Sequence, residues 1–262
     1  MFSKWEYWLR SLITLVTFYI FTSLYFIIAL PVIILPLKIG WYFANFWLAA
    51  SLAIYKNIGG MTFEIRGLEN IPSSQKGYIV AAKHQSAWET IGLAYIFKQP
   101  AYILKKELLM LPLFGFYLKK FQMIPIDRSK GKKALQYMLP FAEVALNNKR
   151  PLIIFPEGTR TKPGSPAKYK HGFAKLYTAL DSPIVPVALN TGFFWPKKSF
   201  TRYKGKIIIS ILPAIESGLS HEAIYEQITS SIEAETVKLA AETAEAYPNL
   251  PTVKAYKKTQ KS

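Results

Sequence analysis

Residues 77–97 read GYIVAAKHQSAWETIGLAYIF. Residues 77–82 form a short apolar run of the kind that makes a buried strand, and residues 88–97 have the length and apolar content of a helix. The polar segment between them is too short to be more than a loop. A buried strand that leads directly into a helix is the repeating unit of α/β proteins, so this stretch predicts that fold class.

The same alternation continues along the chain after Gly59 and Gly60, which mark a boundary. Helices separate many of the predicted strands, and the last helix is capped by Ser220. This order predicts a mostly parallel sheet flanked by helices. The tail after Pro248 is polar and Lys-rich, and we expect it to be loose. The further strands are expected at residues 62–66, 101–104, 123–126, 152–155, 184–190 and 207–212, and the further helices at 130–148, 174–180 and 221–247.

Two uncharged stretches precede this region, residues 11–37 and 39–55. A helix needs about 20 apolar residues to cross a bilayer, which the first stretch exceeds and the second approaches. Pro31 and Pro36 interrupt helical hydrogen bonding between them. We therefore expect a membrane-embedded hairpin of two helices in residues 1–58, and an α/β domain in residues 59–262. The first stretch is too long for a signal peptide. The sequence leaves open whether the hairpin spans the bilayer or only dips into it.

The composition is both basic and apolar. The 262 residues include 33 Lys and Arg against 16 Asp and Glu, and 51% are hydrophobic. Twenty of the basic residues and five of the acidic ones fall in residues 103–206. This combination favours an anionic membrane surface over nucleic acid as partner. Because a hairpin returns the chain to its starting side, the positive-inside rule places both flanks in the cytoplasm. The absence of cysteine excludes disulfides and a cysteine nucleophile.

A histidine and a carboxylate follow the strand of residues 77–82. His84 comes directly before the expected helix, and Glu89 lies five positions later. Five residues turn a helix by roughly 500°, which would separate the two side chains around the axis. We therefore expect His84 in the loop, with Glu89 reaching back to one ring nitrogen and leaving the other free as a general base. From this pair alone, a structural histidine remains an alternative.

Polar groups also follow three other predicted strands. Residues 155–160 read FPEGTR, where Gly158 allows backbone N–H groups to approach a ligand and Arg160 offers a planar fork for phosphate. Arg128 and Lys105 stand at the ends of two further strands. All three cations are candidates for phosphate binding, although a solvated surface position fits Lys105 equally well.

Four blocks of this sequence resemble those of the glycerolipid acyltransferase family. That family carries a His-x4-Asp motif, a block ending in arginine, a Phe-Pro-Glu-Gly-Thr-Arg block and a Val-Pro-Val-type block. Here the matching segments are His84 to Glu89, Gly115 to Arg128, Phe155 to Arg160 and Ile184 to Val187. The match covers roughly residues 66–190, and its third block is complete. The chain departs from the family pattern at Glu89, where aspartate is usual.

The resemblance implies an enzyme of phospholipid biosynthesis in the bacterial inner membrane, with its catalytic domain on the cytoplasmic face. It would transfer a fatty acyl group from acyl-coenzyme A or acyl carrier protein to the sn-2 hydroxyl of 1-acyl-sn-glycerol 3-phosphate, forming phosphatidic acid without a cofactor. The resemblance assigns catalysis to His84 and Glu89. It assigns acceptor binding to Glu157, Gly158, Thr159 and Arg160, with Arg128 and Lys105 as further phosphate ligands.

Other functions explain fewer of these features. The acceptor could be another lyso-lipid, such as a lyso-aminolipid, and a non-catalytic membrane-surface binding protein would need neither His84 nor Glu89. A serine hydrolase lacks its Gly-x-Ser-x-Gly turn. No metal site is expected, because the three histidines are scattered in the sequence. Nucleic-acid binding would explain the charge but not the hairpin.

Overall fold

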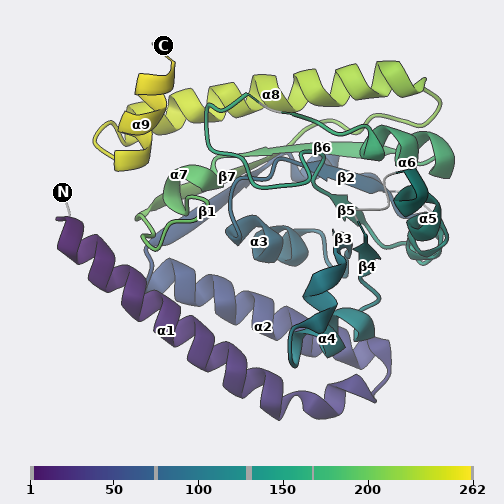
Figure 1. Ribbon diagram of the computed structural model, residues 1–262, viewed down its shortest axis with the longest axis horizontal. Coiled ribbons are helices and arrows are strands. Elements are labelled where there is room, and N and C mark those ends of the chain that lie inside the picture. The colour runs from purple at the N-terminus through teal and green to yellow at the C-terminus, as the bar shows by residue number, and fades with distance from the viewer. Residues whose placement is uncertain (1–2, 74–75, 128–131, 167, 261–262) are drawn as a thin grey trace.

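The computed structural model describes residues 3–73, 76–127, 132–166 and 168–260. Within these ranges the strands form one sheet, in the order β1-β7-β6-β2-β5-β3-β4 (Figure 1). The strands are β1 (Met61–Arg66), β2 (Ile79–Ala82), β3 (Ala101–Lys105), β4 (Ile124–Ile126), β5 (Leu152–Ile154), β6 (Ile184–Leu189) and β7 (Gly205–Ile211).

Helices surround this sheet. The α-helices are α1 (Lys4–Ile28), α2 (Leu37–Asn57), α3 (Trp88–Ile96), α4 (Phe114–Lys120), α5 (Lys132–Asn147), α6 (Gly172–Leu180), α7 (Thr191–Phe194), α8 (His221–Ala246) and α9 (Pro251–Thr259). Shorter 3-10 helices are η1 (Leu30–Ile33), η2 (Leu68–Asn70) and η3 (Lys106–Met110).

The sheet is mostly parallel, as predicted. Five strands run parallel to one another, in the order β6, β2, β5, β3 and β4. Strand β7 pairs antiparallel with β6 at one side of this set. Strand β1 completes the sheet beside β7. Because the five strands from β6 to β4 share one direction, their carboxyl ends meet along a single edge, which is where open α/β sheets bind ligands.

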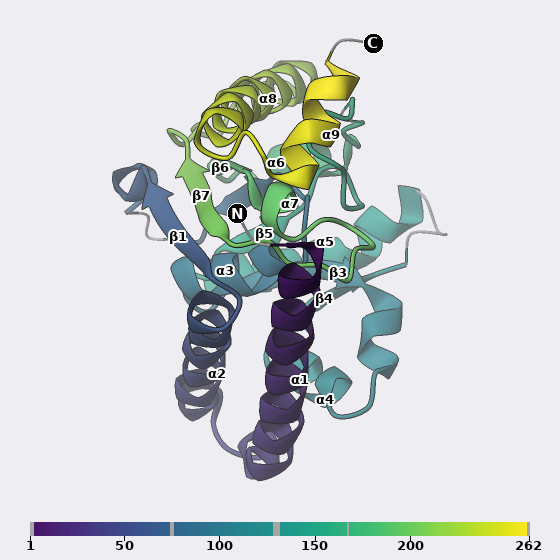
Figure 2. The ribbon, with the colours of Figure 1, turned by 90° about the vertical axis from the view of Figure 1, so that its left-hand side faces the viewer.

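Each face of the sheet carries its own hydrophobic core. One core packs α5, α6 and α8 on the sheet through residues such as Met138, Phe173 and Ile228. The other includes Leu52 of α2 and Trp88 of α3. Figures 1 and 2 show these layers, with α8 on one side of the sheet and α2 and α3 on the other.

The strands and helices predicted after Gly60 agree with the observed ones to within two residues at each end, apart from the helix start expected at residue 130, which lies outside the described residues. Three α-helices were not predicted: α4, α7 and α9. The prediction of a loose tail is wrong. Residues 251–259 form α9, in which Val253 is fully buried and Tyr256 packs edge-on against Phe193. Two apolar side chains, Val253 and Tyr256, are thus sufficient to pack this Lys-rich segment against the rest of the protein.

The N-terminal region is a helical hairpin, with α1 and α2 joined through η1 near Pro31 (Figure 2). Of the helices in the described part of the chain, α1 is the one long and apolar enough to cross a bilayer, and 17% of its most apolar stretch is buried. The sequence predicted two helices of this kind, and the described part of the chain has one. Helix α2 instead buries Leu48, Leu52 and Tyr55 in the core on its side of the sheet.

Arg150 ties the hairpin side of the molecule to the sheet edge. Its guanidinium donates to the carbonyl oxygens of Gln99, Pro100 and Phe121 at 2.8–2.9 Å, and it lies 5.4 Å from the ring of Trp41 in α2. Burial lowers the pKa of Arg150 to about 10, so the side chain stays charged at neutral pH. Two loops, at residues 99–100 and at residue 121, thus share one donor group.

Replacing Arg150 with alanine should lower the free energy of unfolding by about 3 kcal/mol, because buried carbonyl acceptors lose their donors. Arg150→Lys should recover only part of this loss, since a single ammonium cannot reproduce the planar fork. Denaturant unfolding in detergent measures both variants. The exposed Lys133→Ala is the control and should unfold like the unmodified protein. Equal stability of Arg150→Ala and Lys133→Ala would contradict the role given to Arg150.

Candidate active site

Three neighbouring parallel strands end at the same edge and each delivers one polar residue. His84 follows β2, Glu157 follows β5 and Thr191 follows β6. Strand β2 lies between β5 and β6 in the sheet. Residues that are far apart in the sequence are therefore brought together by strand order.

His84 lies in the loop before α3, which begins at Trp88. Its Nδ1 is 2.9 Å from Oε1 of Glu89, so Nδ1 carries the proton that this contact requires. The loop placement and the contact agree with the prediction. The His84 ring stacks on Phe155 at 4.0 Å between centroids, which orients it further. Nε2 is then the ring nitrogen available to act as a base.

Glu89 is fully buried and its carboxylate is surrounded by donors. Oε1 accepts from the backbone N–H groups of Gln85 and Ser86 at 2.7 and 2.6 Å, in addition to His84. Oε2 accepts from the hydroxyl of Thr191 at 2.9 Å. The glutamate found here in place of the usual aspartate therefore spans two elements, the His84 loop and α7. A buried charge is tolerated when its oxygens are satisfied in this way.

Helix α7 is a support for the histidine loop that was not predicted from the sequence. Thr191 contacts Glu89, and the N–H of Gly192 donates to the side chain of Gln85 at 3.0 Å. Both residues directly follow the strand that contains the Val-Pro-Val block. Their position after a predicted strand was the one sequence signal that they could belong to the site. The strand order was needed to show that β6 lies beside β2.

Glu157 is buried, and its carboxylate accepts a hydrogen bond from the loop that contains His84. Its Oε2 accepts from the backbone N–H of His84 at 2.6 Å, and its Oε1 accepts from the hydroxyl of Thr161 at 2.6 Å. Lys83, also buried, lies 2.8 Å from Oε1 and 2.6 Å from Glu233 of α8. Glu157 thus shapes the site by fixing the backbone at His84, and Lys83 is a partner that sequence reasoning missed.

The Gly158–Arg160 turn is joined to the histidine loop, because the N–H of Thr161 donates to the carbonyl of His84 at 2.8 Å. Gly158 has a φ of 65°, which favours glycine. Lys197 donates to the carbonyl of Arg160 at 2.5 Å and to the hydroxyl of Thr159 at 3.2 Å. Lys197 was not predicted, and it adds a second cation to this turn.

The other two predicted phosphate ligands differ in what the structure shows. Lys105 ends β3, is about half exposed and pairs with Glu107 at 3.2 Å. It lines the same cavity as His84. Arg128 lies outside the described residues.

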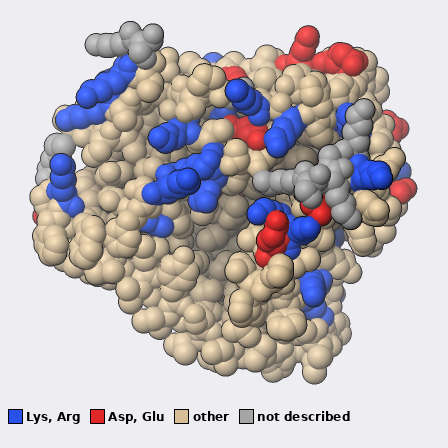
Figure 3. Space-filling view, in the orientation of Figure 1, with Lys and Arg blue, Asp and Glu red and all other residues tan. Residues whose placement is uncertain are grey.

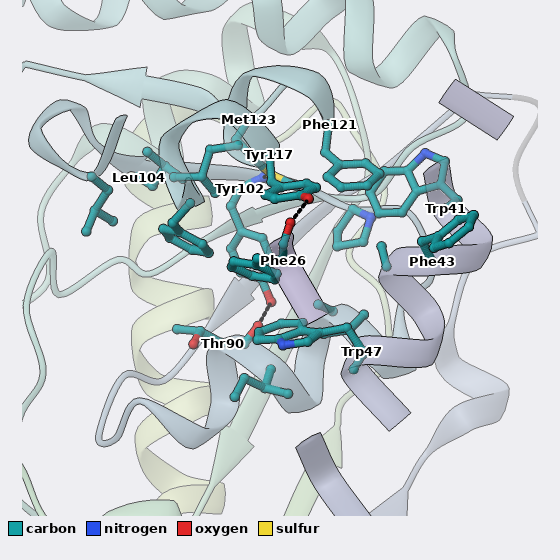
Figure 4. Close-up of a pocket in the computed structure, with 18 of the residues that line it drawn as sticks. Phe26, Trp41, Phe43, Trp47, Thr90, Tyr102, Leu104, Tyr117, Phe121 and Met123 are labelled. Atoms are coloured by element: carbon teal, nitrogen blue, oxygen red, sulfur yellow. Dashed lines mark hydrogen bonds between the residues drawn. The ribbon is translucent and has the colours of Figure 1, made fainter. Parts of the chain in front are cut away.

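A cavity of about 440 Å³ opens beside His84 and extends between the sheet edge and the hairpin. Its walls come from α1, α2, α3, β3 and α4, and aromatic side chains dominate them (Figure 4). The hydroxyls of Tyr102 and Tyr117 are directed to the carbonyls of Thr90 and Phe26, at 3.0 and 2.6 Å. Because these polar groups are used internally, the cavity presents a mainly apolar surface suited to a hydrocarbon chain.

Charge is distributed unevenly around this site. Figure 3 shows basic side chains gathered above a hollowed part of the surface, while the lowest part of this face, where α1 and α2 meet, shows no charged side chain. An apolar cavity with Lys105 among its lining residues suits a molecule with a long acyl chain and an anionic head.

Comparison with known proteins agrees with this geometry. The sequence model of the family described as Acyltransferase matches residues 62–190. The 1-acyl-sn-glycerol-3-phosphate acyltransferase of Pseudomonas aeruginosa is 36% identical over 185 residues, which is 70% of this chain and 71% of that protein. The enzyme of the same name from Helicobacter pylori is 32% identical over 175 residues, 65% of this chain and 73% of that protein.

A solved structure has the same fold. The crystal structure of the 1-acyl-sn-glycerophosphate (LPA) acyltransferase PlsC from Thermotoga maritima superimposes with a TM-score of 0.75 at 20% identity, covering 89% of this chain and 97% of that one. The matched family region contains His84, Glu89 and the whole turn from Phe155 to Arg160. The chain therefore belongs to the acyltransferase family that includes the bacterial 1-acyl-sn-glycerol-3-phosphate acyltransferases.

Proposed function

We propose that this enzyme acylates the sn-2 hydroxyl of 1-acyl-sn-glycerol 3-phosphate (lysophosphatidic acid) to form phosphatidic acid, with an acyl thioester of coenzyme A or of acyl carrier protein as donor. The observation that carries the proposal is the pairing of His84 with a buried Glu89 at the mouth of an apolar cavity. The names of the relatives supply the acceptor class.

In the proposed reaction, Nε2 of His84 takes the proton of the acceptor hydroxyl while that oxygen attacks the thioester carbonyl. The resulting tetrahedral intermediate collapses by breaking the carbon–sulfur bond. The proton on His84 then passes to the leaving sulfur, which departs as a thiol. Glu89 stabilises the imidazolium that forms between these steps. No cofactor is required, because the thioester supplies the activated acyl group.

Phosphate binding is proposed for Arg160, Lys105 and Arg128. Arg160 belongs to the turn bonded to the His84 backbone, and Lys105 lies at the rim of the cavity. Arginine is suited to bidentate contact with phosphate, and lysine acts as a point charge. Arg128 is included because it follows β4, whose neighbour β3 ends at Lys105.

A membrane location is proposed from the hairpin. The outer side of α1 exposes Ile13, Ile20, Leu24 and Ile28, whereas α2 packs against the α/β domain. This arrangement suits a hairpin that dips into one leaflet of the bilayer and keeps the site at the surface where lyso-lipids reside. The basic flanks favour the cytoplasmic face of a bacterial inner membrane.

The purified enzyme in detergent, given lysophosphatidic acid and an acyl thioester, should release free thiol and form phosphatidic acid in equal amounts. A panel of acceptors with and without phosphate, including a lyso-aminolipid, tests the head group. Comparing the rates with acyl-coenzyme A and with acyl carrier protein tests which thioester is the donor. Lack of product with every acceptor and both donors would reject the proposed function.

The cavity predicts acyl-chain selectivity. Ala44 of α2 lines the cavity between Trp41 and Trp47. Enlarging it to phenylalanine should block the passage of a long chain, because the packed aromatic walls leave little room to adjust. We expect Ala44→Phe to lower the rate with palmitoyl thioester about tenfold relative to decanoyl thioester, a difference of about 1.4 kcal/mol.

A matched control exists in the same helix. Ala49 faces outward and is exposed, so Ala49→Phe should leave the ratio of the two rates unchanged. If Ala44→Phe lowered both rates equally, the cavity would not be the acyl site. If Ala49→Phe shifted the ratio as strongly, the effect would be a general one on α2.

A further inference from the structure

The segment formed by η3 and α4 exposes large apolar side chains. Met110 is 81% exposed, Phe116 56% and Leu111 47%. We call these three residues the apolar ridge. Exposed apolar side chains that occur singly are ordinary, but a group of them on one short segment indicates a contact surface.

The backbone of this segment is held in a costly conformation. Leu113, between η3 and α4, has a φ of 58° and a ψ of −55°, in a turn where the N–H of Phe114 donates to the carbonyl of Pro112 at 2.6 Å. A non-glycine residue in such a region costs on the order of 1–3 kcal/mol. A side chain at Gly115 would meet the carbonyl oxygen of Leu109. The exposure of the three ridge residues places them on the outer side of this segment.

The segment is packed directly against the hairpin. The hydroxyl of Tyr117 donates to the carbonyl of Phe26 in α1, and their rings are 4.7 Å apart. Phe121 lies 4.6 Å from Trp41 of α2, and Lys120 donates to the carbonyl of Leu35 between the two helices. Both ribbon views place α4 beside the hairpin, on the same side of the sheet. The segment that carries the ridge therefore lies directly beside α1 and α2.

We propose that the apolar ridge is a second bilayer contact, inserted among lipid chains beside the hairpin. The occupant is lipid rather than protein, because the segment that carries the ridge packs against α1, the helix that is apolar enough to enter a bilayer. Lys105 immediately precedes the segment and Lys106 begins it, and each is about half exposed. Lys119 lies in the last turn of α4. Cations that flank an apolar surface suit anionic head groups, at roughly 1 kcal/mol each.

This contact gives the segment a role in the proposed function, on which the following step rests. The inner side of the same segment lines the cavity through Leu108, Phe114, Tyr117 and Leu118. One short segment thus separates the acyl cavity from the region that we assign to lipid. An acyl chain could then move between bilayer and cavity past this segment without crossing water.

Because the chain contains no cysteine, single-cysteine variants can carry an environment-sensitive fluorophore at chosen positions. Met110→Cys reports on the ridge, Ile20→Cys on the outer side of α1, and Val237→Cys, 60% exposed on α8, on the opposite side of the sheet. Vesicles of phosphatidylcholine with phosphatidylglycerol are then added to each labelled full-length protein.

We expect blue-shifted emission, and quenching by nitroxides on the lipid chains, at positions 110 and 20 but not at 237. Labelled Ile20→Cys responding alone would overturn the ridge contact and leave the hairpin in the membrane. No response at either position would overturn the ridge contact and the membrane location together. Equal responses at all three positions would show unspecific adsorption and would also overturn the proposal.

Activity separates this inference from the proposed function. Met110 does not line the cavity, so Met110→Asp should retain turnover of lysophosphatidic acid dispersed in detergent. With the same acceptor in vesicles, its rate should fall about tenfold or more relative to the unmodified enzyme. Equal rates of the two proteins on vesicles would contradict a lipid contact at the ridge. Absence of turnover by the unmodified enzyme in detergent would instead contradict the proposed function.

Discussion

Replacing His84 with alanine should lower the rate of acyl transfer by about 10²–10⁴-fold, the usual contribution of a positioned general base. His84 is the polar side chain at the mouth of the cavity whose free ring nitrogen can receive the acceptor proton. Without it, the hydroxyl must lose its proton to water. The measurement is thiol release under saturating lysophosphatidic acid and acyl thioester.

The variant should remain folded, because the elements around His84 are held by other groups. Glu157 contacts the backbone N–H at position 84, and Thr161 contacts the backbone carbonyl, so both bonds survive the substitution. A thermal unfolding curve close to that of the unmodified enzyme is the control. Turnover within a few fold of the unmodified enzyme would exclude His84 as the base.

The sequence was sufficient to predict two of the loops that meet at the candidate site, those of His84 and Glu157, and the reason is local. The blocks of His84 and Phe155 directly follow the short apolar strands β2 and β5, and the carboxyl ends of parallel strands form ligand-binding edges. The placement of His84 before α3 also followed from local geometry, because a five-residue spacing on a helix would have separated it from Glu89.

The partners of these residues could not be predicted, because they depend on strand order. Thr191 reaches Glu89 only because β6 lies beside β2, and Lys83 reaches Glu233 only because α8 crosses that face of the sheet. The cavity is a further case. Its walls combine the hairpin, α3, β3 and α4, and no periodicity within one segment indicates which apolar faces will meet.

The second large effect is expected at Glu89. Glu89→Gln should reduce the rate by about 10²-fold or more while preserving the fold. The amide oxygen can still accept from Gln85, Ser86 and His84, and the amide nitrogen can donate to the hydroxyl of Thr191, which is able to accept. Shape and hydrogen bonds are thus retained, and the substitution removes mainly the negative charge that stabilises the imidazolium.

Two further variants distinguish charge from geometry at this position. Glu89→Asp keeps the charge, so it should retain more activity than Glu89→Gln. Its side chain is one methylene too short to reach both the His84 loop and α7. Thr191→Val removes one donor from a buried carboxylate and should cost less than either, since the other oxygen keeps its three donors. Steady-state rates of the three variants give this order. Full activity of Glu89→Gln would show that His84 works without a charged partner, and the pairing inferred from the structure would then serve only to position the loop.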